Sequence, residues 1–219
     1  MEIIKFLIDF VLHMDVHLNE IITNYGTWTY GILFFVIFME TGFVVTPFLP
    51  GDSLLFAAGT FASLGSLNPF LLFGLLASAA ILGDTVNYHI GQYIGERAFS
   101  GDIKFLKQEY LEKTQDFYDK HGGKAIILAR FVPIIRTFAP FVAGVGTMKY
   151  RRFIAYNVVG GVIWVALFIS LGYFFGNIPF VKKHFELVIF AIIFISFIPP
   201  VLEFFKARRE AREEAAPAE

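Results

Sequence analysis

The sequence contains no cysteine, and its 219 residues carry no excess charge of either sign. The first absence excludes disulfide bonds, cysteine-type zinc sites and thiol catalysis, and it leaves the redox compartment undecided. Lys and Arg number 18 against 19 Asp and Glu, a net charge of −1 at pH 7, so global charge indicates no partner. No basic patch with interleaved aromatic residues stands outside the loops between apolar segments, which argues against nucleic-acid binding.

Hydrophobic residues, by contrast, make up 56% of the chain, 28 of them Phe, and mean hydropathy is +0.63. Soluble domains usually contain about 45–50% apolar residues. Long apolar runs therefore predict an integral membrane protein. A cleavable signal peptide is not expected, because Glu2, Lys5 and Asp9 interrupt the N-terminal apolar segment.

We expect an all-α integral membrane protein with one membrane domain over residues 1–219. It would have about four transmembrane helices, two opposed re-entrant helical hairpins in an inverted repeat, and interfacial amphipathic helices. The expected segments are an N-terminal amphipathic helix over 1–23, the first span and re-entrant hairpin over 25–66, a second span over 69–97, a cytoplasmic amphipathic helix over 102–121, the second re-entrant hairpin over 124–147, a third span over 153–176, a fourth over 185–205 and a cytoplasmic tail over 206–219.

Prolines and arginines mark the two hairpins. Pro47 and Pro50 interrupt the first apolar run, and the apolar piece over 51–66 is shorter than the roughly 20 residues a span needs. Pro133 and Pro140 are expected to break the second hairpin. Broken backbone at membrane depth is tolerated only inside protein or beside a water-filled cavity. The hairpins therefore indicate a polar site.

The two halves echo each other weakly in sequence. The echoes are Phe48-Leu49-Pro50 with Phe131-Val132-Pro133, Ala58-Gly59 with Ala143-Gly144, and Gly91-xxx-Gly95 with Gly172-xxx-Gly176. Broken segments at corresponding places of inverted halves indicate a transporter binding site near the midplane. The Gly-xxx-Gly pairs could pack helices within one chain or between two copies, so a homo-oligomer stays open.

Lys and Arg are concentrated in the loops on one side of this layout. They are Arg97, Lys104, Lys107, Lys113, Lys120, Lys124, Lys149, Arg151, Arg152, Lys206, Arg208, Arg209 and Arg212, against Lys182 and Lys183 in loops on the other side. The positive-inside rule makes the crowded side cytoplasmic, and it places both termini there.

Charges inside the apolar segments are few. Glu40 and Asp52 flank the first break, and Arg130 and Arg136 flank the second. A charge at the centre of a spanning helix costs about 2.5–3.5 kcal/mol on insertion scales. Arg stays charged and binds phosphate oxygens with two N–H groups, while a carboxylate in apolar surroundings can take up a proton. The predicted roles are substrate binding for the arginines and proton coupling for the acids.

Structural explanations compete with these roles. The four charges could form buried salt bridges that only hold the hairpins together. Asp84 and Asn87 are treated as supporting polar residues, which could instead simply hydrogen-bond the spans together. Trp164 is assigned to lipid contact or core.

Other functional classes have weaker support. His13, His17 and Glu20 have metal-ligand spacing, but they also form the polar stripe of an interfacial helix, so we expect no metal. Gly51-Asp52 and Gly83-Asp84 are reminiscent of intramembrane aspartyl proteases, a reading that leaves both arginines unexplained. A Gly-x-Ser-x-Gly motif is absent. The chain is therefore not expected to be an enzyme.

Three longer motifs carry a family resemblance. They are Glu40-Thr-Gly-Phe-Val-Val-Thr-Pro47-Phe-Leu-Pro50-Gly51-Asp52, Gly83-Asp84-x-x-Asn87-Tyr88-x-x-Gly91 and Ala129-Arg130-Phe-Val-Pro133-Ile-Ile-Arg136-Thr-Phe-Ala-Pro140-Phe-Val-Ala-Gly144. In this order they resemble the DedA family of bacterial membrane proteins, which is similar to eukaryotic lipid scramblases with two re-entrant hairpins. The likeness covers nearly the whole chain.

The resemblance implies a lipid translocase of the bacterial inner membrane. Family members are implicated in returning undecaprenyl phosphate across that membrane, and others in phosphatidylethanolamine movement and in maintaining the proton-motive force. The implied partners are an anionic lipid and protons, without a cofactor, and the family's important acids and arginines map onto Glu40, Asp52, Arg130 and Arg136. The alternatives are a general phospholipid translocase or scramblase, a proton-coupled small-ion antiporter, and an assembly factor in which only a Glu40–Arg130 salt bridge matters.

Overall fold

The computed structural model describes residues 14–43, 51–95, 108–184, 187–188 and 190–192. Regular secondary structure in these ranges is helical throughout. The elements are α2 (Met14–Tyr25), α3 (Trp28–Gly42), α4 (Gly51–Ser63), α5 (Pro69–Ile94), α6 (Gln108–His121), the 3₁₀ turn η2 (Gly122–Lys124), α7 (Ala125–Ala129), α8 (Pro133–Val142), the π-turn η3 (Ala143–Thr147), α9 (Tyr150–Phe175) and α10 (Pro179–Lys183).

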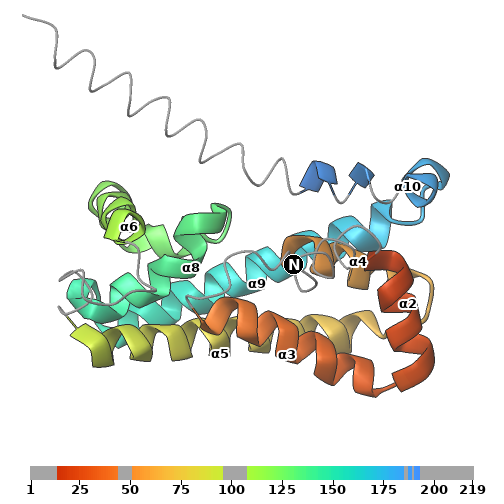
Figure 1. Ribbon diagram of the computed structural model, residues 1–219, viewed down its shortest axis with the longest axis horizontal. Coiled ribbons are helices and arrows are strands. Elements are labelled where there is room, and N and C mark those ends of the chain that lie inside the picture. Colours follow the sequence, from red (N-terminus) through yellow and green to blue (C-terminus); the bar gives the residue numbers. More distant parts are fainter. Residues whose placement is uncertain (1–13, 44–50, 96–107, 185–186, 189, 193–219) are drawn as a thin grey trace, which may run out of the picture.

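Two long apolar helices, α5 and α9, lie side by side along the long axis of the molecule (Figure 1). Asn68 caps the start of α5 by accepting hydrogen bonds from the backbone N–H groups of Phe70 and Leu71, and Gly95 ends it with a φ of 60°. In the described part of the chain these are the two helices long and apolar enough to cross a membrane. Their bounds lie within a few residues of the segments expected over 69–97 and 153–176.

The other expected segments are covered only in part. α3 is apolar but has 15 residues, fewer than a perpendicular span needs. The fourth span, over 185–205, falls mostly outside the described residues, as do 1–13, 102–107, the tail over 206–219 and the breaks at Pro47 and Pro50. α6 ends at His121, where the amphipathic helix over 102–121 was predicted to end.

Two apolar clusters form the core. One gathers α4 with the second half of α9 and the first half of α5, around Leu55, Leu72 and Trp164. The other gathers α6, α7 and α8 around Phe141 and Phe153. Each long helix contributes to both clusters, and buried polar residues lie between its two contributions: Asp84 and Asn87 on α5, and Asn157 on α9. A polar layer therefore crosses the middle of an apolar molecule.

Glycines bring the helices of the two halves into close contact. A Cβ at Gly59 would collide with the Ile169 carbonyl, and one at Gly172 with the Phe56 carbonyl, so α4 and α9 touch through their backbones. Gly144 and Gly91 repeat this arrangement between the α8–η3 segment and α5: a Cβ at Gly144 would collide with the Tyr88 carbonyl, and one at Gly91 with the Phe141 carbonyl. The weak sequence echoes therefore correspond to two equivalent helix crossings.

The second proline pair acts differently from the prediction. The helix is interrupted over Arg130–Val132, and Pro133 is the first residue of α8, where its missing N–H is not needed. Pro140 does not break the segment, because it lies inside α8, which continues to Val142. A proline near the end of a helix removes one backbone hydrogen bond, and here the π-turn η3 follows before Gly146, with φ 145°, ends the segment.

Candidate functional site

Arg136 lies at the centre of the polar layer, bound by two acids. It projects from α8, and its Nη1 donates to Asp52 Oδ1 at 2.7 Å while Nη2 donates to Glu40 Oε1 at 2.6 Å. Glu40 lies near the end of α3 and Asp52 at the start of α4. All three are buried, with Arg136 8% exposed. One guanidinium therefore connects three helices through two charge-assisted hydrogen bonds.

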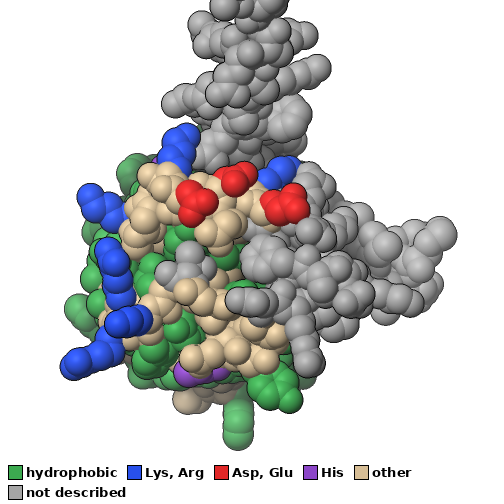
Figure 2. All heavy atoms as spheres, turned by 90° about the vertical axis from the view of Figure 1, so that its left-hand side faces the viewer, with side chains coloured by type: hydrophobic (Ala, Val, Ile, Leu, Met, Phe, Trp, Pro, Cys, Tyr) green, Lys and Arg blue, Asp and Glu red, His purple; other side chains and the backbone are tan. Residues whose placement is uncertain are grey.

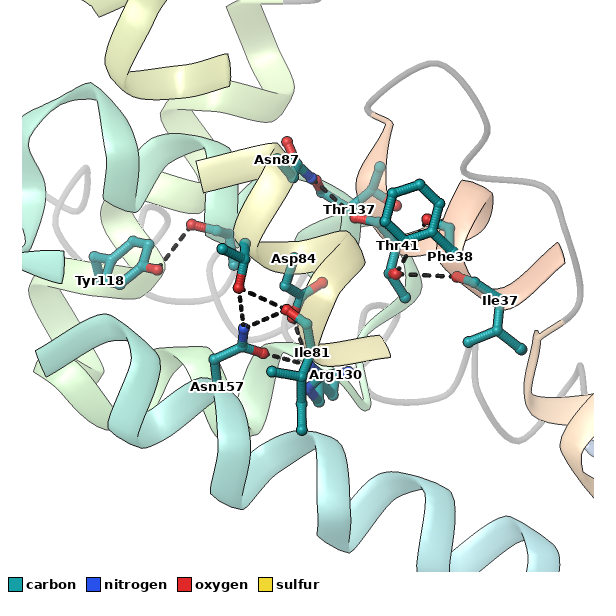
Figure 3. Close-up of polar contacts among 12 residues, drawn as sticks. Ile37, Phe38, Thr41, Ile81, Asp84, Asn87, Tyr118, Arg130, Thr137 and Asn157 are labelled. Atoms are coloured by element: carbon teal, nitrogen blue, oxygen red, sulfur yellow. Dashed lines mark hydrogen bonds and ion pairs between the residues drawn. The ribbon is translucent and has the colours of Figure 1, made fainter. Parts of the chain in front are cut away.

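Arg130 forms a second ion pair with different partners. Its Nη2 donates to Asp84 Oδ2 at 2.5 Å and to Asn157 Oδ1 at 2.6 Å, which joins the break after α7 to both α5 and α9 (Figure 3). The Asn157 amide also donates to the Ile81 carbonyl at 3.0 Å. Arg130 lies against Gly160 and Gly161, whose missing side chains leave room for the guanidinium.

Trp164, on α9, connects the two arginine sites. Its Nε1–H donates at 2.8 Å to Asp52 Oδ1, the same oxygen that accepts from Arg136. The Cζ atoms of Arg136 and Arg130 lie 5.2 and 5.8 Å from its ring centre, within cation–π range. The side chain is fully buried. The expectation of a core position is confirmed, but its polar contact was missed.

Further hydrogen bonds hold α8 beside the site. Asn87 Nδ2 donates to the carbonyls of Thr41 at 3.2 Å and Thr137 at 2.9 Å, so it bridges α3, α5 and α8 (Figure 3). Tyr118, on α6, donates to the Ala139 carbonyl at 2.8 Å. Burial raises the pKa of the Tyr118 hydroxyl well above its ordinary value, so it keeps the proton that it donates. Asn87 joins the apolar helices, as its structural interpretation predicted.

The site holds three carboxylates and two guanidiniums, one net negative charge when all are ionised. Among the described residues, Arg130 Nε and Nη1 and Asp84 Oδ1 are buried and have no hydrogen-bond partner. Such atoms are rare in folded proteins, and they favour a site that rearranges or takes up a ligand. The described residues contain no cluster of His, Asp or Glu suited to a metal ion.

Most residues of this site were predicted from the sequence. One predicted ion pair, Glu40 with Arg130, is wrong. Glu40, Asp52 and Arg136 meet as expected. Arg130 does not pair with Glu40, as the assembly-factor alternative assumed, because Asp84 and Asn157 hold it from the adjacent faces of α5 and α9. Asn157 was missed altogether. Its position one turn before Gly160 and Gly161 in an apolar helix was the available signal, since an amide there needs a buried partner.

The fold and the site together define a class: an α-helical protein of apolar surface with buried, paired charges between its helices. The VTT domain model matches residues 49–174, which include α4 through α9. The chain belongs to the DedA family of VTT-domain membrane proteins.

Curated relatives agree with this assignment. The chain is 56% identical over 218 residues to "Protein DedA" of Escherichia coli K12, covering 98% of this chain and 100% of the relative. It is 43% identical over 189 residues to an uncharacterised membrane protein of Mycobacterium tuberculosis, covering 83% and 82%. It is 33% identical over 177 residues to inner membrane protein YghB of E. coli K12, covering 80% and 78%. No solved structure matches the chain.

Proposed function

We propose that this protein is a transporter, not an enzyme, that moves an anionic lipid across the bacterial inner membrane. Undecaprenyl phosphate is the first candidate, on the family resemblance. Arg136 binds the lipid phosphate, Glu40 and Asp52 exchange protons, and Arg130 contributes a second positive charge. The observation that carries the proposal is Arg136 held by two carboxylates from two different helices inside an apolar protein.

A phosphate competes with carboxylates for the same donors. Arg136 presents Nη1 and Nη2 to one oxygen each of Asp52 and Glu40. A phosphate group offers two oxygens in the geometry that the guanidinium fork prefers. Such a group can replace both acids, and the present arrangement is then the form without lipid, in which the protein neutralises its own arginine.

Proton coupling follows from this exchange. When phosphate takes Arg136, Glu40 and Asp52 lose their cation while they remain buried. An unpaired buried carboxylate is strongly disfavoured, so the acids bind protons as the lipid arrives and release them as it leaves. Trp164 keeps a hydrogen bond to Asp52 during this change.

The topology that we propose places this exchange near the membrane midplane. The pieces before and after each chain break, α3 with α4 and α7 with α8, form re-entrant hairpins that enter from opposite faces, and the end bearing α6 faces the cytoplasm with both termini. The equivalent crossings of α4 on α9 and η3 on α5 support an inverted repeat. Alternate opening on the two sides of Arg136 would expose the site to each leaflet in turn.

The test is lipid movement in proteoliposomes. Undecaprenyl phosphate is placed in both leaflets, and an impermeant phosphatase outside reports how fast the inner pool becomes accessible. Wild type is compared with Arg136→Ala and with Lys183→Ala, which removes an exposed cation from α10 as the control. We expect fast movement in wild type and the control, and movement slowed by about thirtyfold or more in Arg136→Ala. Movement that persists at the wild-type rate without Arg136 contradicts the proposal.

The same vesicles separate the alternatives. An imposed pH gradient that changes the initial rate supports proton coupling. Movement of phosphatidylethanolamine in place of undecaprenyl phosphate would indicate a general phospholipid translocase. Proton flux without any lipid movement, dependent on Glu40 and Asp52 more than on Arg136, would indicate the small-ion antiporter; three acids against two arginines is the observation that favours this candidate.

A further inference from the structure

A second basic region lies outside the buried arginine sites, at the end of the molecule that carries α6. A cavity of about 610 Å³ opens there between the α6–η2 junction and the start of α9. Three of its lining residues are cations, Lys149, Arg151 and Arg152, and one, Asp119, is an acid. The cavity falls within the range of about 300–1,000 Å³ that small-ligand sites occupy.

The three cations outnumber the one acid that lines the cavity with them. All three are exposed, and no side-chain ion pair joins any of them to a residue in the described ranges. Asp119 accepts a hydrogen bond from Gln115 Nε2 at 3.1 Å. Figure 2 shows Lys and Arg side chains along one edge of this end of the molecule, with acidic side chains toward the top. Three like charges around one cavity repel one another, and an anion between them relieves that repulsion.

Two glycines form the wall of the cavity on this side. Gly122, with φ 58°, turns the chain after α6, and Gly123 packs on the first turns of α9. A Cβ at Gly123 would lie 2.6 Å from the Tyr156 ring and 3.2 Å from Arg152 Nε. The pair of glycines therefore lets the turn approach Arg152 without a side chain between them.

The position of the cavity indicates the kind of ligand. Lys149, Arg151 and Arg152 flank the first residue of α9, where a helix apolar enough to cross a membrane begins. The Tyr150 ring packs there at a tilt against the rings of His89 and Tyr88, and Tyr is enriched at membrane–water boundaries. Cations at such a boundary meet lipid headgroups as well as soluble anions.

We propose that this cavity is a second anion site, separate from Arg136, that binds a phosphate group at the membrane boundary. Lys149, Arg151 and Arg152 provide the charge, and the two arginines provide N–H groups for phosphate oxygens. The phosphate belongs either to a lipid headgroup or to a soluble phosphate, and the two sources share this recognition.

The experiment is calorimetric titration of the purified full-length protein in neutral detergent. The probes are short-chain phosphatidic acid, inorganic phosphate and, as the uncharged-headgroup comparison, short-chain phosphatidylcholine. The test variant is Lys149→Gln/Arg151→Gln/Arg152→Gln. Its matched control is Lys113→Gln/Lys120→Gln/Lys124→Gln, which removes three cations from the same end, none of which lines the cavity. All titrations use the Arg136→Ala background, which removes the central phosphate-binding arginine, and any binding left at Arg130 is common to the cavity variant and its control.

We expect the cavity variant to bind phosphatidic acid at least about tenfold more weakly, and the control variant to stay within about twofold of its parent. Inorganic phosphate that binds as tightly as phosphatidic acid identifies a soluble anion; a preference for phosphatidic acid identifies a lipid headgroup. Equal losses in both triple variants, no loss in either, or phosphatidylcholine binding of equal strength would each overturn the site.

Stability is checked by melting temperature in every variant. If the cavity variant melts lower than its control, Arg151→Gln and Arg152→Gln are titrated singly, and each is expected to weaken phosphatidic acid binding by about threefold. The cavity is tested by binding and the Arg136 mechanism by lipid movement. A negative result for the cavity therefore does not contradict the transport mechanism, and a negative result for transport does not contradict the cavity.

Discussion

Arg130 and Arg136 flank the same chain break and face the same tryptophan, yet different parts of the molecule hold them. Arg136 is bound by carboxylates on α3 and α4, which lie on either side of the first predicted break. Arg130 is bound by Asp84 and Asn157 on the long helices α5 and α9, and it is 2% exposed. One arginine therefore contacts the short elements and the other contacts the two long helices.

This difference indicates that the two arginines have different roles. The ion pair of Arg130 joins α5 to the α7–α8 segment with one acid for one cation, so it is electrically complete. Arg136 carries two acids for one cation, so one of its partners is always in excess. A site with surplus acid can exchange a carboxylate for a ligand without leaving its arginine bare. We therefore expect Arg130 to serve mainly stability and Arg136 mainly transport.

Arg136→Ala should give the largest effect on transport. Removing one partner of a buried charge pair typically costs about 2–5 kcal/mol, which corresponds to a loss of roughly thirtyfold or more. The phosphatase-accessibility assay measures this loss. Glu40 and Asp52 can each take up a proton in the variant, which limits its loss of stability, and transport is compared per folded molecule. If Arg136→Ala lowers stability but each folded molecule still transports lipid at the wild-type rate, Arg136 serves stability and not transport.

Arg130→Ala should reduce stability more, by about 3–5 kcal/mol, because it removes the donor that joins Asp84 on α5 to Asn157 on α9. Thermal unfolding in detergent measures the change. The double variant Arg130→Gln/Asp84→Asn keeps a hydrogen-bonding pair without charge and should recover most of the loss, together with part of the transport. If Arg130→Ala is as stable as wild type but inactive, then both arginines act on the substrate.

The sequence allowed half of this contrast to be predicted. Both arginines, Glu40 and Asp52 stand out because charges are rare in apolar segments. Which acid pairs with which arginine depends on the rotation of α5 and α9 about their axes. That rotation is set by helix packing, which the sequence pattern alone does not determine. Asp84 was therefore treated as a supporting polar residue without an assigned partner, although it is the partner of Arg130.

Boundaries and breaks show the same limit. The spans over 69–97 and 153–176 were predicted within a few residues, because capping residues and glycines mark their ends. Pro140 was expected to break a helix and does not, since its cost depends on where the helix ends, which packing against α5 and α6 decides. The role of Trp164 was not predictable, because an indole N–H chooses its acceptor only in the folded core.

Trp164→Phe tests whether the ring couples the two arginine sites. The variant keeps an aromatic ring near both guanidiniums and removes the N–H that donates to Asp52. A hydrogen bond to a charged group contributes about 1.5–3 kcal/mol, so we expect a transport loss of about tenfold or more with smaller changes in melting temperature. Trp28→Phe, at a residue 78% exposed, is the control. Equal transport in the two variants would show that Asp52 does not need this donor.

Gly172→Ala tests the difference between the Arg136 and Arg130 sites by changing a backbone contact. Of these variants, we expect it to have the smallest effect on transport. Gly172 lies where α9 touches α4, and a Cβ there would collide with the Phe56 carbonyl. Relief requires α4 to move away from α9, which separates Asp52 on α4 from Trp164 on α9 while the Arg130–Asp84 pair stays in place. Overpacking of this kind costs about 1–3 kcal/mol.

The matched control is Gly74→Ala, at a helical glycine of α5 with open space where the Cβ would go. That change should raise stability by about 0.5–1 kcal/mol, because Ala favours helix over Gly. Thermal unfolding and lipid movement are measured for both variants. We expect Gly172→Ala to lose transport out of proportion to its loss of stability, since the α4–α9 crossing positions the Arg136 site in particular. A loss of stability with transport unchanged per folded molecule would mean that the crossing holds the fold together but does not position Asp52.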